Sequence, residues 1–188
     1  MLNKRAFTII EILISALIGA FMVGVLFYIL NSGYNVNDLS SAKVAAQSQA
    51  RMVSDWVSRD LRQTVVWELA NNSPSATHMK FRPVLGWDIA GDTYQLDANY
   101  IEYSYDGVAD TLTRDSIDGA GTVLNSRVFN SIVTQPFFTR NDAGDLIPLD
   151  NSVGTSKKVV TLISVNKVSD KGVNSIISLT LETKIRNE

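Results

Sequence analysis

Apolar residues fill the chain from Ile12 to Leu30 without any charge, and only Ser15 in this run is plainly polar. An α-helix rises about 1.5 Å per residue, so a helix over this run covers roughly 28 Å, which matches the apolar core of a bilayer. The run therefore predicts a helix that crosses a membrane once. Glu11 lies just before it, among isoleucines. A carboxylate there is costly enough that a partner or a function is expected for it.

The helical pattern continues beyond the softer segment 31–33. Apolar residues return every three or four positions, which places them on one face of a helix. They are Leu39, Ala42, Ala46, Ala50, Val53, Val57, Leu61 and Val65. Arg51, Asp55 and Arg59 lie on the opposite face at a spacing that suits ion pairs. The sequence "NNSP" (71–74) is expected to end the helix, because proline cannot continue it.

Paired strand-like segments follow, each pair joined by a turn, which is the pattern of β-hairpins. The pairs are "YIEYSY" (100–105) with "TLTRD" (111–115), "QPFFTR" (135–140) with "LIPL" (146–149), and "KKVVTLISV" (157–165) with "SIISLTLETKI" (175–185). Pro136 and Pro148 favour edge positions for the second pair. In the last segment Ile177, Leu179 and Leu181 share one face. Antiparallel strands under an amphipathic helix predict an α+β head.

Charge and cysteine content narrow the function classes. The net charge is −2 and there is no cysteine, so a disulfide framework and a thiolate metal site are excluded. The weak negative charge gives no footprint for nucleic acid, and we expect no nucleic-acid partner. Lys4 and Arg5 precede the apolar run and place the N-terminus in the cytoplasm by the positive-inside bias. The length of the run and the early carboxylate favour a retained anchor over a cleaved secretory signal.

Candidate catalytic chemistry is sparse, so we expect no enzyme, no catalytic residue and no cofactor. His78 is the only histidine and is expected in a loop, and neither G-x-S-x-G nor H-E-x-x-H occurs. Arg51, Arg59 and Arg62 form a basic stripe that Asp55 and Asp60 interrupt, which is typical of a solvated helix face.

Acidic turns are the only candidates for a calcium site. They contain Asp106 and Asp110, Asp115 and Asp118, and Asp142 and Asp145. None has the twelve-residue pattern that ends in a bidentate glutamate, and hairpin turns need aspartate and glycine in any case. We therefore expect no metal site.

The stretch "KRAFTIIEILIS" (4–15) resembles the N-terminal signature of type IV pilin-like proteins, with a short basic leader, a phenylalanine and an apolar helix with one early glutamate. The resemblance implies cleavage by a prepilin peptidase between Ala6 and Phe7 and N-methylation of Phe7. The family usually has glycine before the cut, where this chain has Ala6. Glu11 then becomes the assembly residue, which faces the terminal amine of a neighbouring subunit in the filament. The alternative is that Glu11 has no assembly role and is a boundary residue whose side chain reaches into the lipid headgroups.

Within that family, "ARMVSDWVSRDLRQ" (50–63), "LETKIRN" (181–187) and the segment 101–115 are most similar to W-type minor pilins and J-type pseudopilins. The resemblance implies a leader at 1–6, a transmembrane and filament-core helix at 7–30, an amphipathic helix half at 31–72 and an antiparallel, β-rich periplasmic head at 73–188. This is a pilin-like α+β layout.

The implied function is that of a structural subunit at or near the tip of a type IV pilus or a type II secretion pseudopilus. The implied partners are other pilin or pseudopilin subunits, the prepilin peptidase, the inner-membrane assembly platform and the membrane itself. The implied location is the bacterial inner membrane, with one span, a cytoplasmic N-terminus and a periplasmic head. The alternative is a signal-anchored periplasmic binding module that does not assemble into a filament.

Overall fold

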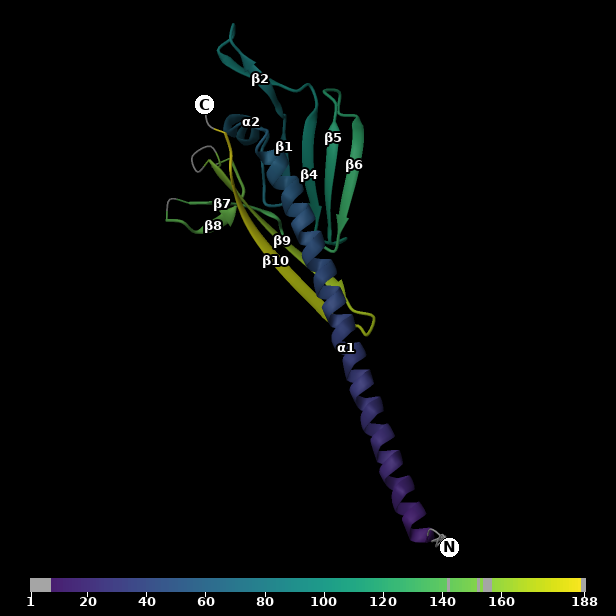
Figure 1. The fold of residues 1–188 in the computed structure, drawn as a ribbon. Helices are drawn as coiled ribbons and strands as arrows, with labels where there is room; N and C mark the ends of the chain where they lie inside the picture. Colours follow the sequence, from purple (N-terminus) through teal and green to yellow (C-terminus); the bar gives the residue numbers. More distant parts are fainter. Residues whose placement is uncertain (1–7, 142, 152, 154–156, 187–188) are drawn as a thin grey trace.

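The computed structural model describes residues 8–141, 143–151, 153 and 157–186. Helix α1 (Ile9–Leu61) is 53 residues long, and Figure 1 shows it as a rod whose first half projects away from the rest of the chain. Thr8 begins it with a capping box: the Thr8 hydroxyl accepts the N–H of Glu11, and the Glu11 carboxylate accepts the N–H of Thr8. The head is built around the second half of α1.

The sequence predicts one continuous helix up to the turn at 71–74, but the structure has two helices in this region. Helix α1 stops at Leu61, and a separate short helix α2 (Val66–Asn71) follows. Thr64, Val65 and Val66 are β-branched in succession, which weakens helical preference. Val65 is extended, with φ −114° and ψ 154°, and bridges to Arg186 near the other end of the chain. At the break, the backbone of Val65 therefore pairs with Arg186 at the other end of the head instead of continuing the helical hydrogen bonds.

The first sheet has the strand order β1-β4-β5-β6, and all of its pairs are antiparallel. Its strands are β1 (His78–Phe81), β4 (Tyr100–Asp106), β5 (Thr111–Ile117) and β6 (Val123–Asn130). Strands β4 and β5 are the hairpin that the sequence predicts. The side chain of Asp106 accepts the backbone N–H groups of Val108 and Ala109 and so closes their turn.

The second sheet has the order β10-β9-β7-β8 and contains both other predicted hairpins. Its strands are β7 (Phe137–Arg140), β8 (Leu146–Pro148), β9 (Lys158–Val168) and β10 (Asn174–Lys184). Strand β8 is an edge strand, as Pro148 predicts, whereas β7 pairs with both β8 and β9 and is interior. Strands β2 (Val84–Asp88) and β3 (Thr93–Leu96) form a separate two-stranded hairpin.

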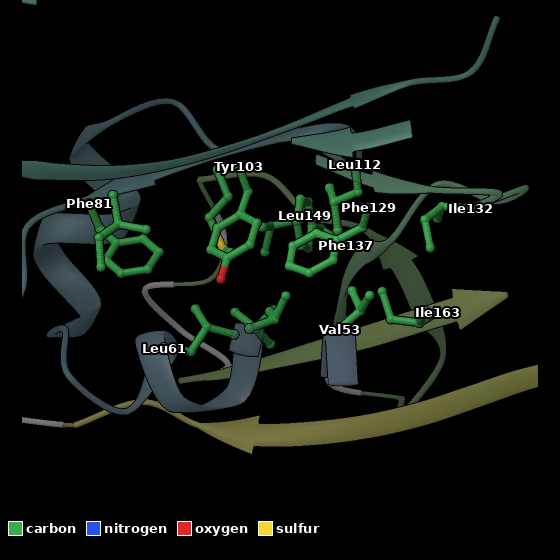
Figure 2. Packing of buried hydrophobic residues seen from close by; sticks show 14 of the residues in the cluster. Val53, Leu61, Phe81, Tyr103, Leu112, Phe129, Ile132, Phe137, Leu149 and Ile163 are labelled. Carbon is green, nitrogen blue, oxygen red and sulfur yellow. The ribbon is translucent and has the colours of Figure 1, made fainter. Parts of the chain in front are cut away.

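One apolar core joins the helix to both four-stranded sheets. The small and branched residues Ala46, Ala50, Val53, Val57 and Leu61 of α1 are all fully buried, which confirms the helical face read from the sequence. Figure 2 shows Tyr103 of β4, Leu112 of β5 and Phe129 of β6 above the helix, and Ile163 of β9 beside Val53. The rings of Tyr103 and Phe137 meet edge to face with their centroids 6.1 Å apart. The α+β architecture is thus confirmed: one long N-terminal helix followed by antiparallel sheets.

Candidate functional site

The first half of α1 carries the largest uncovered apolar surface among the described residues. Every residue from Ile9 to Asn37 is exposed. Ile9 is 80% exposed, Phe21 74% and Phe27 75%, values that large apolar side chains have only when nothing covers them. The helix is long and apolar enough to cross a membrane, and none of its apolar window is buried against the head. Such a surface needs either lipid or other chains around it.

Glu11 stands at the free end of this surface and folds back onto the start of the helix. Its Oε2 atom accepts the backbone N–H of Thr8 at 2.9 Å and the Thr8 hydroxyl at 3.1 Å. A carboxylate has about four acceptor positions on two oxygens. No described residue donates to Oε1 of Glu11, so this oxygen remains open to another donor. The predicted cleavage and methylation positions, Ala6 and Phe7, lie outside the described residues.

Buried polar side chains fasten the packed half of α1 to the first sheet. Oδ2 of Asp60 accepts the hydroxyl of Tyr103 at 2.6 Å and Nε of Arg114 at 2.6 Å. The Asp60 side chain is 4% exposed, so it does not belong to the exposed basic stripe in which the sequence analysis placed it. Burial, the charge of Asp60 and the hydrogen bond to it together raise the pKa of Tyr103 well above its ordinary value. Tyr103 therefore stays neutral and remains a donor.

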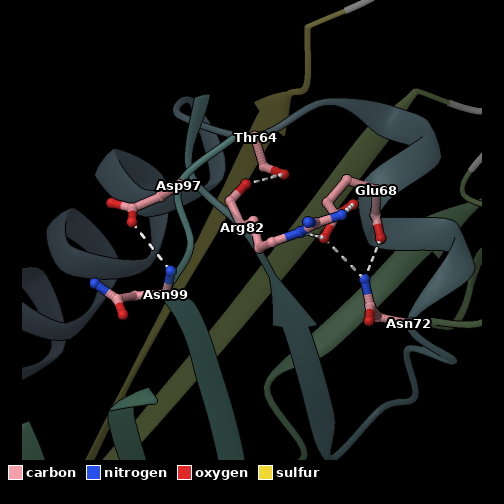
Figure 3. A network of polar contacts seen from close by, with 6 residues as sticks. All are labelled: Thr64, Glu68, Asn72, Arg82, Asp97 and Asn99. Atoms are coloured by element: carbon pink, nitrogen blue, oxygen red, sulfur yellow. Dashed lines mark hydrogen bonds and ion pairs between the residues drawn. The ribbon is translucent and has the colours of Figure 1, made fainter. Parts of the chain in front are cut away.

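A second ion pair, between a buried glutamate and a partly exposed arginine, ties α2 to the residue that follows β1 and appears in Figure 3. Glu68, whose side chain is 3% exposed, accepts Nε of Arg82 at 2.8 Å and a terminal guanidinium nitrogen at 3.0 Å. Such a two-pronged bond is among the stronger polar contacts in proteins. The hydrogen bond to Glu68 raises the pKa of Arg82. The side-chain amide of Asn72 donates to the carbonyl and the carboxylate of Glu68, and the Thr64 hydroxyl donates to the carbonyl of Arg82. These bonds hold the segment between α1 and α2 at one side of the ion pair and the end of α2 at the other.

Three arginines surround the indole ring of Trp56 on α1. The guanidinium carbons of Arg59, Arg114 and Arg127 lie 5.2, 5.1 and 4.9 Å from the ring centroid, which is cation–π distance. Arg114 pairs with Asp60, whereas Arg59 and Arg127 form no ion pair with any described residue. This cluster could not be predicted from the sequence, because its members come from α1, β5 and β6. The i, i+3 spacing of Trp56 and Arg59 was the only signal available.

The remaining candidates from the sequence have structural roles in the head. His78 begins β1 instead of lying in a loop, and its Nε2 is 2.8 Å from Glu102 on β4. Asp118 accepts the backbone N–H groups of Ala120 and Thr122 across a turn, and the bond to Thr122 contributes most to the lowered pKa of Asp118. Among the residues that the structure describes, no three His, Asp or Glu side chains gather as metal ligands would. Asp142 lies outside the described residues.

The chain was also compared with known proteins. No family model matches it, and no curated protein sequence matches it significantly.

Proposed function

We propose that this chain is a minor pilin or pseudopilin, a structural subunit of a type IV pilus or a type II secretion pseudopilus. Residues 1–6 are its leader, Phe7 is its methylated first residue after processing, and the head faces the periplasm. Its partners are other pilin-like subunits, the prepilin peptidase and the inner-membrane assembly platform. The prepilin-like segment 4–15 and the uncovered first half of α1 together support this proposal.

The observation that carries the proposal is a long helix that is exposed and apolar over one half and packed into a head over the other. Such a helix can exchange lipid for the helices of neighbouring subunits without any change in the head. Glu11 supports the same reading, because Oε1 is left without a described donor while Oε2 completes the helix cap. A terminal amine from a neighbour would bind at Oε1. Pairing makes the cost of a carboxylate in apolar surroundings tolerable.

The alternative function is a signal-anchored periplasmic binding module that never assembles. One observation favours this alternative: the capping box gives Glu11 a role within its own chain. The N-terminus separates the two functions. We expect membrane-extracted protein from cells with an active prepilin peptidase to lack residues 1–6 and to carry a methyl group on Phe7. Intact-mass and N-terminal peptide spectrometry measure both. A mature chain that still begins at Met1 would contradict the proposal.

Glu11 is tested with two substitutions that separate the cap from the charge. Glu11→Ala removes both, whereas Glu11→Gln keeps a capping-box acceptor and removes the negative charge. Loss of one partner from a buried pair costs about 3–5 kcal/mol, so incorporation into sheared filaments should fall strongly for both variants. Membrane insertion and head folding should stay normal. If the glutamine variant is incorporated like the parent chain, the carboxylate serves the helix cap and the assembly role of Glu11 is wrong.

Tip position is the finer part of the proposal, and uncovered sheet edges support it. Strands β6 and β8 each form one of the two outer strands of their sheet. The exposed apolar residues Val123, Leu124 and Val128 lie along β6. An edge strand offers unpaired backbone groups to a partner. We propose that other minor subunits dock on these edges.

A further inference from the structure

The lowest part of the head, where α1 leaves it, is the turn between β9 and β10 (Figure 1). This β9–β10 turn comprises residues 169–173. The N–H of Ser169 donates to the carbonyl of Val173, and the N–H of Val173 donates to the hydroxyl of Ser169. Gly172 has φ +79°, a conformation that glycine adopts without strain. These features fix the shape of the turn.

The β9–β10 turn is bonded directly to α1. The Asp38 carboxylate accepts the backbone N–H groups of Asp170 at 3.2 Å and Lys171 at 3.4 Å. Nζ of Lys171 donates to the side-chain oxygen of Asn35. The position of the turn along the helix is therefore set by Asn35 and Asp38, and the distance of the turn from the apolar half of α1 is fixed with it.

That distance can be worked out from the helix rise. Leu30 ends the apolar run, and Asn35 lies five residues further on, which is roughly 7–8 Å along the axis. The polar headgroup layer is about 5–8 Å thick on each side of a bilayer. When the apolar run fills the bilayer core, the ammonium group of Lys171 lies at the depth of the lipid phosphates. The turn backbone, at Asp38, lies roughly 12 Å from the core.

A groove between the turn and the helix begins near this level, at Tyr34, and continues away from the membrane to Ser41. It has a volume of about 350 Å³ and is lined by Tyr34, Asn37, Asp38, Ser41, Asp170 and Lys171. Tyr34 is 70% exposed, and tyrosine is enriched at the membrane–water interface. Val168, just before the turn, is 59% exposed, and Val173, its last residue, is 50% exposed. A cation, an interfacial aromatic ring and the two aspartates thus line one groove, and two exposed valines lie close to Asp170 and Lys171 in the chain.

We propose that the β9–β10 turn is a lipid-contact element in which Lys171, at the end of the groove nearest the membrane, binds the phosphate of a phospholipid headgroup. The inference rests on the proposed function, in which α1 spans a bilayer. Its occupant is a lipid of that same bilayer, because the bond to Asn35 holds the ammonium group of Lys171 at headgroup depth. The contact would hold the head upright on the membrane before the subunit leaves the bilayer.

The absence of cysteine from the chain makes the test direct, since a single introduced cysteine carries the only label. The full chain is reconstituted in phosphatidylcholine vesicles, and a fluorophore is attached at Val173→Cys, Phe21→Cys or Val108→Cys. Lipids with a nitroxide on the headgroup or deep in the acyl chain then quench emission at their own depth. Val108 is 99% exposed in the β4–β5 turn. Strand β5, which follows this turn, pairs with β6, and the Asn130 carbonyl of β6 accepts a hydrogen bond from Gln49 of α1. Gln49 lies roughly 20 Å further from the membrane along the helix than Asn35.

We expect headgroup nitroxides to quench the fluorescence of the label at residue 173. The fluorescence of the label at residue 108 should be the same with and without these nitroxides. Acyl-chain nitroxides should quench the label at residue 21. Quenching at residue 21 with none at residue 173 would overturn the inference and leave the spanning helix intact. No quenching at residue 21 would instead contradict the span itself, and the inference would fall with it.

A charge-reversal pair tests Lys171. Lys171→Glu places a carboxylate beside the phosphate and should lower headgroup quenching at residue 173. Lys184→Glu is the matched control, because Lys184 is exposed at the far end of β10 and should leave the quenching unchanged. If the Lys171→Glu chain is quenched like the parent chain, Lys171 does not bind the phosphate.

Discussion

Replacement of Arg114 by methionine tests whether the buried pair with Asp60 fastens the long helix to the first sheet. Methionine keeps much of the apolar stem of arginine and loses the guanidinium. Asp60 is 4% exposed and Arg114 is 16% exposed, so water cannot take the place of the lost partner without moving into the core. The variant leaves a buried carboxylate with Tyr103 as its only donor among the described residues.

The expected loss of stability follows from these contacts. Removal of one partner from a buried ion pair costs about 3–5 kcal/mol. The Tyr103 hydroxyl still bonds the carboxylate, which favours the lower end of that range, whereas loss of the contact with Trp56 at 5.1 Å adds about 0.5–1 kcal/mol. We expect a loss of about 3.5–4 kcal/mol, which lowers the Tm by roughly 7–16 °C for a domain of this size.

Urea and thermal unfolding of a chain that starts at Asn31, followed by circular dichroism, measure this loss. Arg140→Met is the matched control: it breaks the pair with Glu182, in which both side chains are more than a third exposed, and should cost less than about 1 kcal/mol. Asp60→Asn combined with Arg114→Met should recover most of the loss, because the buried charge is gone. Equal losses for the two single variants would refute the reasoning.

Three further predictions concern folding, pH and position. A chain that starts at Asn31 should be soluble and should unfold in one cooperative transition, since the buried face of α1 and both large sheets remain; aggregation or a gradual melt would show that the head is not independent. Stability should fall as the pH rises beyond about 10, because the unfolded chain releases the Tyr103 proton there while burial keeps it on the folded chain. The Tyr103→Phe variant should lose this part of the alkaline slope. Quantitative mass spectrometry of purified filaments should find this chain far below the major subunit, and crosslinking should join its head to other minor subunits; near-equal abundance would make it a shaft subunit.

Periodic patterns in the sequence were sufficient for the helix, its buried face and three hairpins. Repeats of 3.6 and 2 residues are local, so Ala46, Val57 and Leu179 reveal their faces without knowledge of the rest of the chain. The same local reasoning missed β6. Its residues carry no clean alternation, because only Phe129 is buried and the others are exposed along an open edge.

The break between α1 and α2 and the polar fasteners were not predictable in this way. Val65 leaves the helix because Arg186 pairs with it, and that partner lies at the opposite end of the chain. Asp60 reads as one more charge on a helix face until the fold brings Tyr103 and Arg114 to it. At the N-terminus, the sequence predicted a special role for Glu11, whereas its bond to Thr8 required the geometry of the helix start.

The position of helix α1 at the start of the chain also affects the order in which the head can fold during synthesis. Its apolar face, from Ala42 to Leu61, is covered from one side by β9 and β10, which begin about a hundred residues later at Lys158. At a synthesis rate of about 5–20 residues per second, that face waits roughly 5–20 s for its cover. During this interval the helix is already synthesised while its packing partner is not. Loss of the last hairpin by premature termination would therefore expose the side of this face that β9 and β10 cover, and we expect such chains to aggregate or be degraded instead of persisting as partly folded heads.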